Sequence, residues 1–263
     1  MAEDQPALPD GADVTIDFVR QRNALLVRAD LSALWVDYYL HLADQKLHYE
    51  PAQDRVFRDG LAAFVLHCAS RPRNEHLSWT ISLQDPRLNV FLTGDNEDCM
   101  VAGRLFTENV RATDTNVFIA ELMPRRDSEK RRSVVNFQGP NLLGAVVAYY
   151  ADSEQRAARC FDLGEDQFAM LISHPDCDEP WLRDLDVAAV QRLAGTETVA
   201  RIERRGYRWG CGCNQQKIMG ALAAAARDDM PRLFGSEESI HVQCPRCAAM
   251  HILTREAMEA FLA

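Results

Sequence analysis

Apolar and polar residues alternate along the chain with two different periods, which divide most of it into predicted strands and helices. Apolar residues recur at helical spacing in three segments, and we predict helices over 31–42, 51–68 and 140–150. The alternation from Trp79 to Leu83 is repeated from Leu88 to Leu92, which predicts a hairpin. Shorter apolar runs predict further strands over 24–27, 101–106, 116–122, 133–137, 160–163 and 168–172. Because strands and helices interleave without a regular βαβ rhythm, the sequence predicts an α+β fold with a mixed strand and helix core.

A change of composition over residues 174–180, where two prolines stand among acidic residues, predicts a boundary after this core. The next segment, 181–193, is amphipathic and predicts a helix. Thr196 then predicts the N-cap of a second short helix with apolar Val199 and Ile202. We therefore predict four parts: a disordered tail over 1–13, the α+β core over 14–174, a partly helical, metastable linker over 175–208 and a small zinc-binding domain over 209–263.

Composition and charge narrow the classes of protein that the chain can be. It has 263 residues, of which 47% are hydrophobic and 26% charged, the ordinary composition of a globular protein. Its 29 Lys and Arg residues against 39 Asp and Glu residues give a net charge of −10, which disfavours binding to nucleic acid or anionic membranes. The acidic start has no apolar signal segment, and no apolar run approaches the roughly 18 residues of a membrane helix. We therefore predict a cytoplasmic protein with no nucleic-acid or membrane partner, in which cysteines stay reduced.

Four of the eight cysteines form two close pairs near the C-terminus. The first pair is Cys211-Gly212-Cys213, and the second, Cys244-Pro245-Arg246-Cys247, follows after thirty residues (214–243). Four soft thiolates in two pairs suit tetrahedral zinc, with each sulfur about 2.3 Å from the metal and no coordination position open to substrate. We predict one Zn²⁺ per chain in the reduced protein, bound by Cys211, Cys213, Cys244 and Cys247. A helix over 215–227 is expected between the pairs, and a hairpin of 240–242 with 250–253 is expected to carry the second pair.

The spacing of the first pair leaves two interpretations of the zinc site open. In the first, the site is purely structural: a domain as small as 209–263 buries little apolar surface, and zinc binding of about 10 kcal/mol or more would fold it. In the second, the site is also a redox switch. Zinc ribbons use Cys-x-x-Cys twice, whereas the single-residue spacer here permits a strained, readily reversed disulfide once the metal leaves. Loss of the metal would then unfold the domain.

The two cysteine pairs, the helix after the first and the closing Leu253-Thr254-Arg255-Glu256 resemble the C-terminal redox switch of the 33-kDa heat-shock chaperone family (HslO). The segment Phe137-Gln138-Gly139 and the helix that ends in Tyr149-Tyr150-Ala151-Asp152-Ser153-Glu154-Gln155 are similar to a strand-to-helix segment of that family. The chain departs from the family in having a shorter segment between Pro180 and Trp209 than the family's linker.

This resemblance implies a redox-regulated holdase that is quiescent when it is reduced and bound to zinc. Oxidation would form the disulfides Cys211–Cys213 and Cys244–Cys247, release zinc and unfold the switch together with the linker. The exposed apolar surface would then bind unfolding client proteins without ATP, with a homodimer as the active form. An apolar, marginally stable linker, as predicted over 175–208, fits this mechanism.

Two other classes of function compete with this one. The alternative is a constitutive protein-binding or scaffold protein with a purely structural Cys₄ zinc module. A thiol oxidoreductase using Cys244 and Cys247 is disfavoured, because such an enzyme needs an exposed low-pKa thiolate, commonly at a helix N-terminus, and Cys244 is predicted in a hairpin. Neither a GxSxG elbow nor an HExxH helix occurs, so we predict that the protein is not an enzyme.

The remaining cysteines and a run of arginines have simpler interpretations. A reactive thiol or an extra metal ligand at Cys177, beside His174 and Asp176, is disfavoured because nearby acidic residues raise the pKa of its thiol. Together with the three others it is interpreted as a packing or loop residue: Cys68, Cys99, Cys160 and Cys177. The arginine run before the first pair is either the solvated face of a helix or charge compensation for the negative Zn(Cys)₄ centre: Arg201, Arg204, Arg205 and Arg208.

Overall fold

The structure is a computed structural model that describes residues 11–124 and 129–263. Within them ten strands form one sheet, in the order β7-β6-β3-β4-β5-β10-β1-β2-β9-β8, and the predicted α+β class is confirmed. One half of the sheet is made of β3 (Glu75–Leu83), β4 (Leu88–Asp95), β5 (Met100–Phe106), β6 (Asn116–Pro124) and β7 (Arg131–Phe137). The other half is made of β1 (Ala12–Val19), β2 (Ala24–Asp30), β8 (Ala158–Gly164), β9 (Gln167–Ser173) and β10 (Val199–Trp209).

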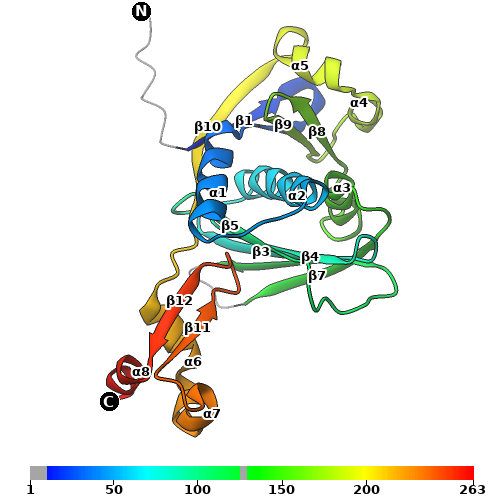
Figure 1. Cartoon of the computed structure of the whole chain (residues 1–263). Coiled ribbons are helices and arrows are strands. Elements are labelled where there is room, and N and C mark those ends of the chain that lie inside the picture. The colour runs from blue at the N-terminus through cyan, green and yellow to red at the C-terminus, as the bar shows by residue number, and fades with distance from the viewer. Residues whose placement is uncertain (1–10, 125–128) are drawn as a thin grey trace, which may run out of the picture.

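The two halves of the sheet face each other across a layer of helices, α1 (Ser32–Asp44), α2 (Pro51–Ala69) and α3 (Leu142–Asp152) (Figure 1). Helix α2 begins at Pro51, behind a capping box made by Glu50 and Gln53, which satisfies backbone donors of its first turn. Its second half is buried nearly all round, as expected for a helix enclosed between two apolar sheet faces. The halves are joined at one place, where β10 pairs in parallel with β5 through Arg208–Met100 and Trp209–Val101.

A buried histidine lies in this middle layer. His67 of α2 is 2% exposed, and its Nδ1 lies 2.8 Å from the hydroxyl of Tyr150 in α3. The Ser70 hydroxyl donates to the carbonyl oxygen of His67 and accepts from Tyr150, so the tyrosine oxygen is left to accept from Nδ1–H. Burial, together with the smaller effect of the nearby Arg71 guanidinium, lowers the pKa of His67 to about 3.

Folding stability should fall as the pH falls below about 6.5, because the unfolded chain then binds a proton at His67 that the folded chain excludes. A folded pKa near 3 makes the loss about 2 kcal/mol at pH 5. Urea unfolding at pH 7.5, 6 and 5 measures the free energy of unfolding at each pH. His67→Gln should show a smaller decline with pH than the wild type, whereas His48→Gln, at an exposed position, should keep the full decline. Equal declines in all three proteins would contradict the assignment.

Two short helices cover the outer face of the β1-β2-β9-β8 half of the sheet. They are α4 (Glu179–Asp184) and α5 (Val187–Thr196), and we call them the α4–α5 layer. The single helix predicted over 181–193 is therefore wrong in one respect: Leu185 is extended, and the Asp186 side chain caps α5 by accepting from Ala189 N at 2.7 Å. This layer packs on an apolar cluster of its own, separate from the cluster around α2: Val19, Ala24, Leu26, Phe161, Ala169, Leu171, Leu182, Leu185, Val190 and Leu193.

The second helix predicted after Thr196 is wrong, because Val199–Trp209 forms β10. This strand pairs antiparallel with β1 from Val19–Val199 to Ala12–Tyr207. Charged side chains on the two strands pair with each other, and this hides the alternation typical of a strand. Of the tail predicted over 1–13, residues 12 and 13 belong to β1, and residues 1–10 lie outside the described part of the chain.

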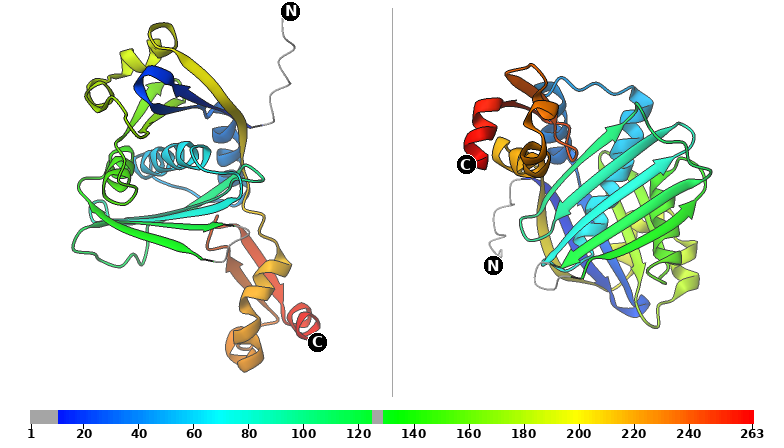
Figure 2. Two further views of the ribbon diagram at one scale, coloured as in Figure 1. Left: turned by 180° about the vertical axis from the view of Figure 1, so that it is seen from behind. Right: turned by 90° about the horizontal axis from the view of Figure 1, so that it is seen from below.

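The C-terminal residues form a small unit that projects from the core, as both views of Figure 2 show. It consists of α6 (Gln215–Asp228), α7 (Met230–Phe234), a hairpin of β11 (Ser239–Gln243) and β12 (Met250–Thr254), and α8 (Arg255–Leu262). The helix and the hairpin predicted here are confirmed. Their apolar side chains gather around two cysteines: Ile218, Ala226, Phe234, Cys244, Cys247, Leu253 and Met258.

In the described part of the chain, none of the helices has the length and apolar character needed to span a membrane.

Candidate metal centre

The first cysteine pair lies between the end of β10 and the start of α6. Gly210 N donates to Val101 O at 2.8 Å and so ties this segment to β5. Gly212 has φ +62°, a left-handed conformation that favours glycine and allows both flanking cysteines to turn toward the same point. Asn214 caps α6 by accepting from Lys217 N, and the ammonium of Lys217 donates to Gly212 O at 2.7 Å. The pair is thus followed at once by a capped helix N-terminus with a cation beside it.

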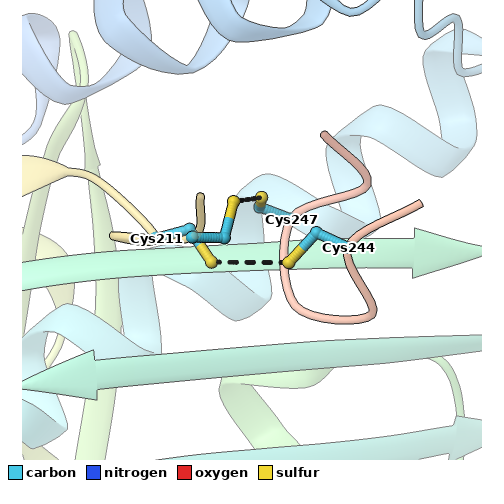
Figure 3. A group of neighbouring side chains, drawn as sticks. Cys211, Cys244 and Cys247 are labelled. Atoms are coloured by element: carbon cyan, nitrogen blue, oxygen red, sulfur yellow. Dashed lines mark hydrogen bonds between the residues drawn. The ribbon is translucent and has the colours of Figure 1, made fainter. Parts of the chain in front are cut away.

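The second pair lies in the turn between β11 and β12, which we call the CxxC turn (residues 244–247). Cys244 N donates to Ala249 O at 2.8 Å, and Ala248 N donates back to Cys244 O at 2.9 Å. Ala248 closes the turn with φ +63°. These backbone bonds direct both cysteine side chains toward the first pair (Figure 3).

The four sulfur atoms form one cluster. The sulfurs of Cys211 and Cys244 lie 3.7 Å apart, as do those of Cys213 and Cys247, and all four lie within 4.8 Å of one another (Figure 3). Four sulfurs about 2.3 Å from a central zinc ion would lie about 3.8 Å from each other, whereas a disulfide would bring two of them to about 2.05 Å. All eight cysteines are free thiols. The observed spacing therefore fits a tetrahedral thiolate site, and its donor set fits zinc.

The protonation of the cluster is shared among its sulfurs. Hydrogen bonds from Cys211 and Cys247 hold the pKa of Cys244 well below its ordinary value. The bond that Cys211 donates to Cys244 raises the pKa of Cys211 to about 12, and burial raises the pKa of Cys213. Binding of a metal would displace the remaining protons, because zinc is bound by thiolates.

A histidine that the sequence analysis missed lies against the cluster. His251 of β12 has its Nε2 at 3.3 Å from the sulfur of Cys213. A donor in this position stabilises the charged form of a metal-binding thiolate. Its sequence signal is a histidine four positions after Cys247, on the strand that the CxxC turn leads into.

The arginine run predicted to be a solvated helix face, or to compensate the cluster's charge, has a different role. These residues lie on a strand, and three have acidic partners within the sheet: Arg201 pairs with Asp17, Arg204 with Asp13, and Arg205 with Glu203. Both interpretations are therefore wrong for these three. The positive groups next to the cysteines are instead Lys217 and the N-terminus of α6.

The other four cysteines are poor nucleophiles at neutral pH, in agreement with their interpretation as packing or loop residues. Burial raises the pKa of Cys160 to about 12 and that of Cys68 well above its ordinary value. The pKa values of Cys99 and Cys177 are also raised, with burial as the largest cause.

Comparisons with known proteins agree with the fold and the site. The sequence model of the family described as "Hsp33 protein" matches residues 162–253. The chain is 26% identical to the 33 kDa chaperonin of Nitrosococcus oceani over 149 residues, which are 49% of this chain and 52% of that protein, so this match spans about half of the relative's length. It is 23% identical to the 33 kDa chaperonin of Aliivibrio salmonicida over 259 residues, 86% of this chain and 88% of that protein.

A solved structure shows the same fold. The crystal structure of the 33 kDa chaperonin (heat shock protein 33 homolog) from Thermotoga maritima matches with a TM-score of 0.69 at 14% identity, covering 97% of this chain and 98% of that one. The sheet, the middle helices and the C-terminal four-cysteine unit define an α+β protein with a thiolate cluster of the kind that binds metal. Together with the sequence matches, they make the chain similar in fold and in sequence to the 33 kDa chaperonins and to the Hsp33 family model.

Proposed function

We propose that this chain is a redox-regulated, ATP-independent holdase chaperone that binds unfolding proteins after oxidation. Reduced protein would hold one Zn²⁺ through Cys211, Cys213, Cys244 and Cys247. The observation that carries the proposal is the spacing of these four sulfurs in a unit whose small apolar cluster is built around two of them. The names of the relatives, 33 kDa chaperonins, support a chaperone function. We propose no catalytic site.

Bound zinc would supply the cross-link that closes the C-terminal unit. Cys244 and Cys247 are 1% and 2% exposed and pack with the buried side chains of α6, α7, β12 and α8. A unit of this size buries too little apolar surface to fold comfortably without such a link. Its folding would therefore depend on the redox state of the four sulfurs.

Oxidation would consume these sulfurs as ligands. Each disulfide forms when two thiols lose two electrons and two protons, and one hydrogen peroxide takes them up to give two waters. The proposed pairs, Cys211–Cys213 and Cys244–Cys247, would thus use two peroxides and release the metal. The one-residue spacer makes the first disulfide strained and easily reduced, which suits a reversible switch.

The outer sheet face beneath the α4–α5 layer is the surface that we propose for client binding. It is apolar on β1, β2 and β9, and arginine side chains of β2 and β8 bind backbone carbonyls of the layer. Arg28 donates to Val190 O at 2.9 Å, and Arg159 donates to Leu185 O at 3.1 Å. The layer leads directly into β10 and from there to the first cysteine pair, so release of the metal unit would loosen it through that strand. In this proposal 175–208 is the linker between core and switch, the protein is cytoplasmic, and its active form is a homodimer.

A second candidate is a constitutive protein-binding scaffold with a structural zinc module. The observation that favours it is β10 itself. The last part of the proposed linker, residues 199–208, is a strand in the interior of the sheet, paired with β1 along its length. Arg205 also holds it to the segment after α2 by donating to Arg71 O at 3.0 Å. A linker anchored in this way resists unfolding, and the metal site would then only stabilise the fold.

One experiment on a single sample separates the two candidates. Zinc content and free thiols of the reduced full-length protein are measured before and after peroxide at raised temperature, alongside light scattering from a heat-unfolding enzyme. The holdase proposal expects about one zinc released per chain, four fewer thiols and suppressed scattering only after oxidation. If zinc and thiols are lost while scattering is unchanged, the redox-regulated holdase is excluded. Equal suppression before and after oxidation would support the constitutive scaffold.

A further inference from the structure

The C-terminal unit is held to the core by its CxxC turn. In Figure 1 the turn end of the β11–β12 hairpin points at the core sheet. Two core side chains reach the backbone of the cysteines themselves: Arg104 of β5 donates to Cys244 O at 3.3 Å, and His41 of α1 donates through Nε2 to Cys247 O at 2.7 Å. The carbonyl groups of both cysteines in this turn are therefore bound by the core.

Three further hydrogen bonds surround these two. Arg104 also donates to the Gln243 side chain at 2.7 Å, so that its guanidinium spans the start of the turn. Arg246 donates to the hydroxyl of Thr93 in β4 at 2.9 Å. Met250 N, just after the turn, donates to the side chain of Gln45 at 2.7 Å. The whole turn is thus fixed from both sides by residues of α1, β4 and β5.

His41 connects the two cysteine pairs. Its ring lies 5.5 Å from that of Trp209, which precedes Cys211 by two residues, while its Nε2 binds the carbonyl oxygen of Cys247. The same histidine therefore contacts the chain on both sides of the sulfur cluster. Trp209 is in turn fixed against Tyr38 of α1, with ring centroids 5.2 Å apart. Helix α1 holds both halves of the cluster in one arrangement.

We infer that His41 and Arg104 are positioning residues of the metal site, through which the core sets how tightly and how long the C-terminal unit holds its metal. This inference rests on the proposed function, which assigns zinc to the four cysteines. Holding a ligand turn in its binding geometry before the metal arrives lowers the cost of binding, and residues behind metal ligands commonly change metal affinity 10–100-fold. The two equilibria are linked, so bound metal must strengthen the docking of the C-terminal unit on the core by the same factor by which docking strengthens metal binding.

The alternative is that these bonds only attach one domain to another. In that case their removal would change the position of the C-terminal unit but leave its metal site as it was. The rate at which zinc is lost to a chelator separates the two, because it reports on the site and not on the position of the domain. If the positioning role is correct, a conservative variant that keeps a hydrogen-bond donor at position 41 or a cation at position 104 should restore slow release of zinc.

The experiment follows zinc transfer from the reduced full-length protein to excess 4-(2-pyridylazo)resorcinol by absorbance. We expect H41A and R104M each to release zinc several-fold faster, and the double variant about 10–100-fold faster than the wild type. H41Q and R104K should recover part of the loss. The matched controls are H48A, seven positions further along the chain, and R87M, in the β3–β4 turn; both residues are exposed, and both variants should release zinc at the wild-type rate.

Each outcome has a distinct consequence. A wild-type protein that contains no zinc after reductive purification contradicts the proposed function and not merely this inference. A wild-type protein with one zinc and variants that release it at the wild-type rate overturn the inference and leave the proposed function standing. Should H41A be purified without metal, titration with zinc against a competing chelator gives its affinity. A lowered affinity that H41Q partly restores supports the positioning role, and a wild-type affinity contradicts it.

Discussion

Serine in place of Cys244 should leave the C-terminal unit of the reduced protein without zinc and largely unfolded. Cys244 is the most buried of the four cysteines, accepts hydrogen bonds from its neighbours and packs inside the cluster of Ile218, Phe234 and Leu253. Zinc bound by four thiolates contributes about 10 kcal/mol or more to the folding of such a unit, and a hydroxyl is a poor substitute ligand. Zinc analysis, loss of helical far-ultraviolet signal and rapid proteolysis of residues 211–263 would measure the effect.

The control for this prediction is Cys177→Ser. Cys177 is a partly buried thiol outside the cluster, in the segment between β9 and α4, so its replacement should leave one zinc per chain and a protease-resistant C-terminus. The core should remain folded in both variants, because its apolar cluster is separate from that of the C-terminal unit. A reduced Cys244→Ser protein with an ordered, metal-free C-terminus would show that the metal does not hold this unit together.

The strands and helices of the core were largely predictable because each buries one face, which leaves a period of two or a helical period in the local sequence. The hairpin from Glu75 to Asp95 and helix α2 are examples. Strand β10 was not predictable in this way, and β1 was assigned in part to the tail although Ala12, Val14 and Ile16 alternate with polar residues. Their pairing joins Asp13 to Arg204, residues 191 positions apart, and each strand alone carries charges that are typical of a solvated segment. Only the pairing of the two explains why those charges can lie within a sheet.

The four cysteines could be assigned to one site because the short spacing within each pair already brings two sulfurs close together. The only assumption needed was that the two segments carrying the pairs approach each other. Their surroundings could not be predicted. His41 and Arg104 come from α1 and β5, and neither residue stands out from its neighbours in the sequence. The environment that sets the properties of the site depends on how a small unit docks on a large one. Local periodicity contains no information about that docking.

Aspartate in place of Leu193 should turn the reduced protein into a constitutive holdase. Leu193 of α5 is 1% exposed and packs in the cluster beneath the α4–α5 layer. An unpaired carboxylate cannot remain there without a cost of several kcal/mol, so α5 should leave the sheet and expose apolar residues such as Leu26 and Leu171. The cluster around α2 is separate and should stay intact, as should the metal site at the far end of β10.

The measurement is light scattering from a heat-unfolding enzyme, with fluorescence of a hydrophobic dye and zinc content recorded on the same reduced sample. Leu193→Asp should bind the dye, retain its zinc and suppress aggregation about as well as oxidised wild type. Val187→Asp is the matched control, because Val187 lies in the same helix but is 41% exposed, and it should behave as reduced wild type. A Leu193→Asp protein that binds dye yet does not suppress aggregation would place the client surface elsewhere. Activity with zinc still bound would support the proposal that uncovering this sheet face is sufficient for client binding.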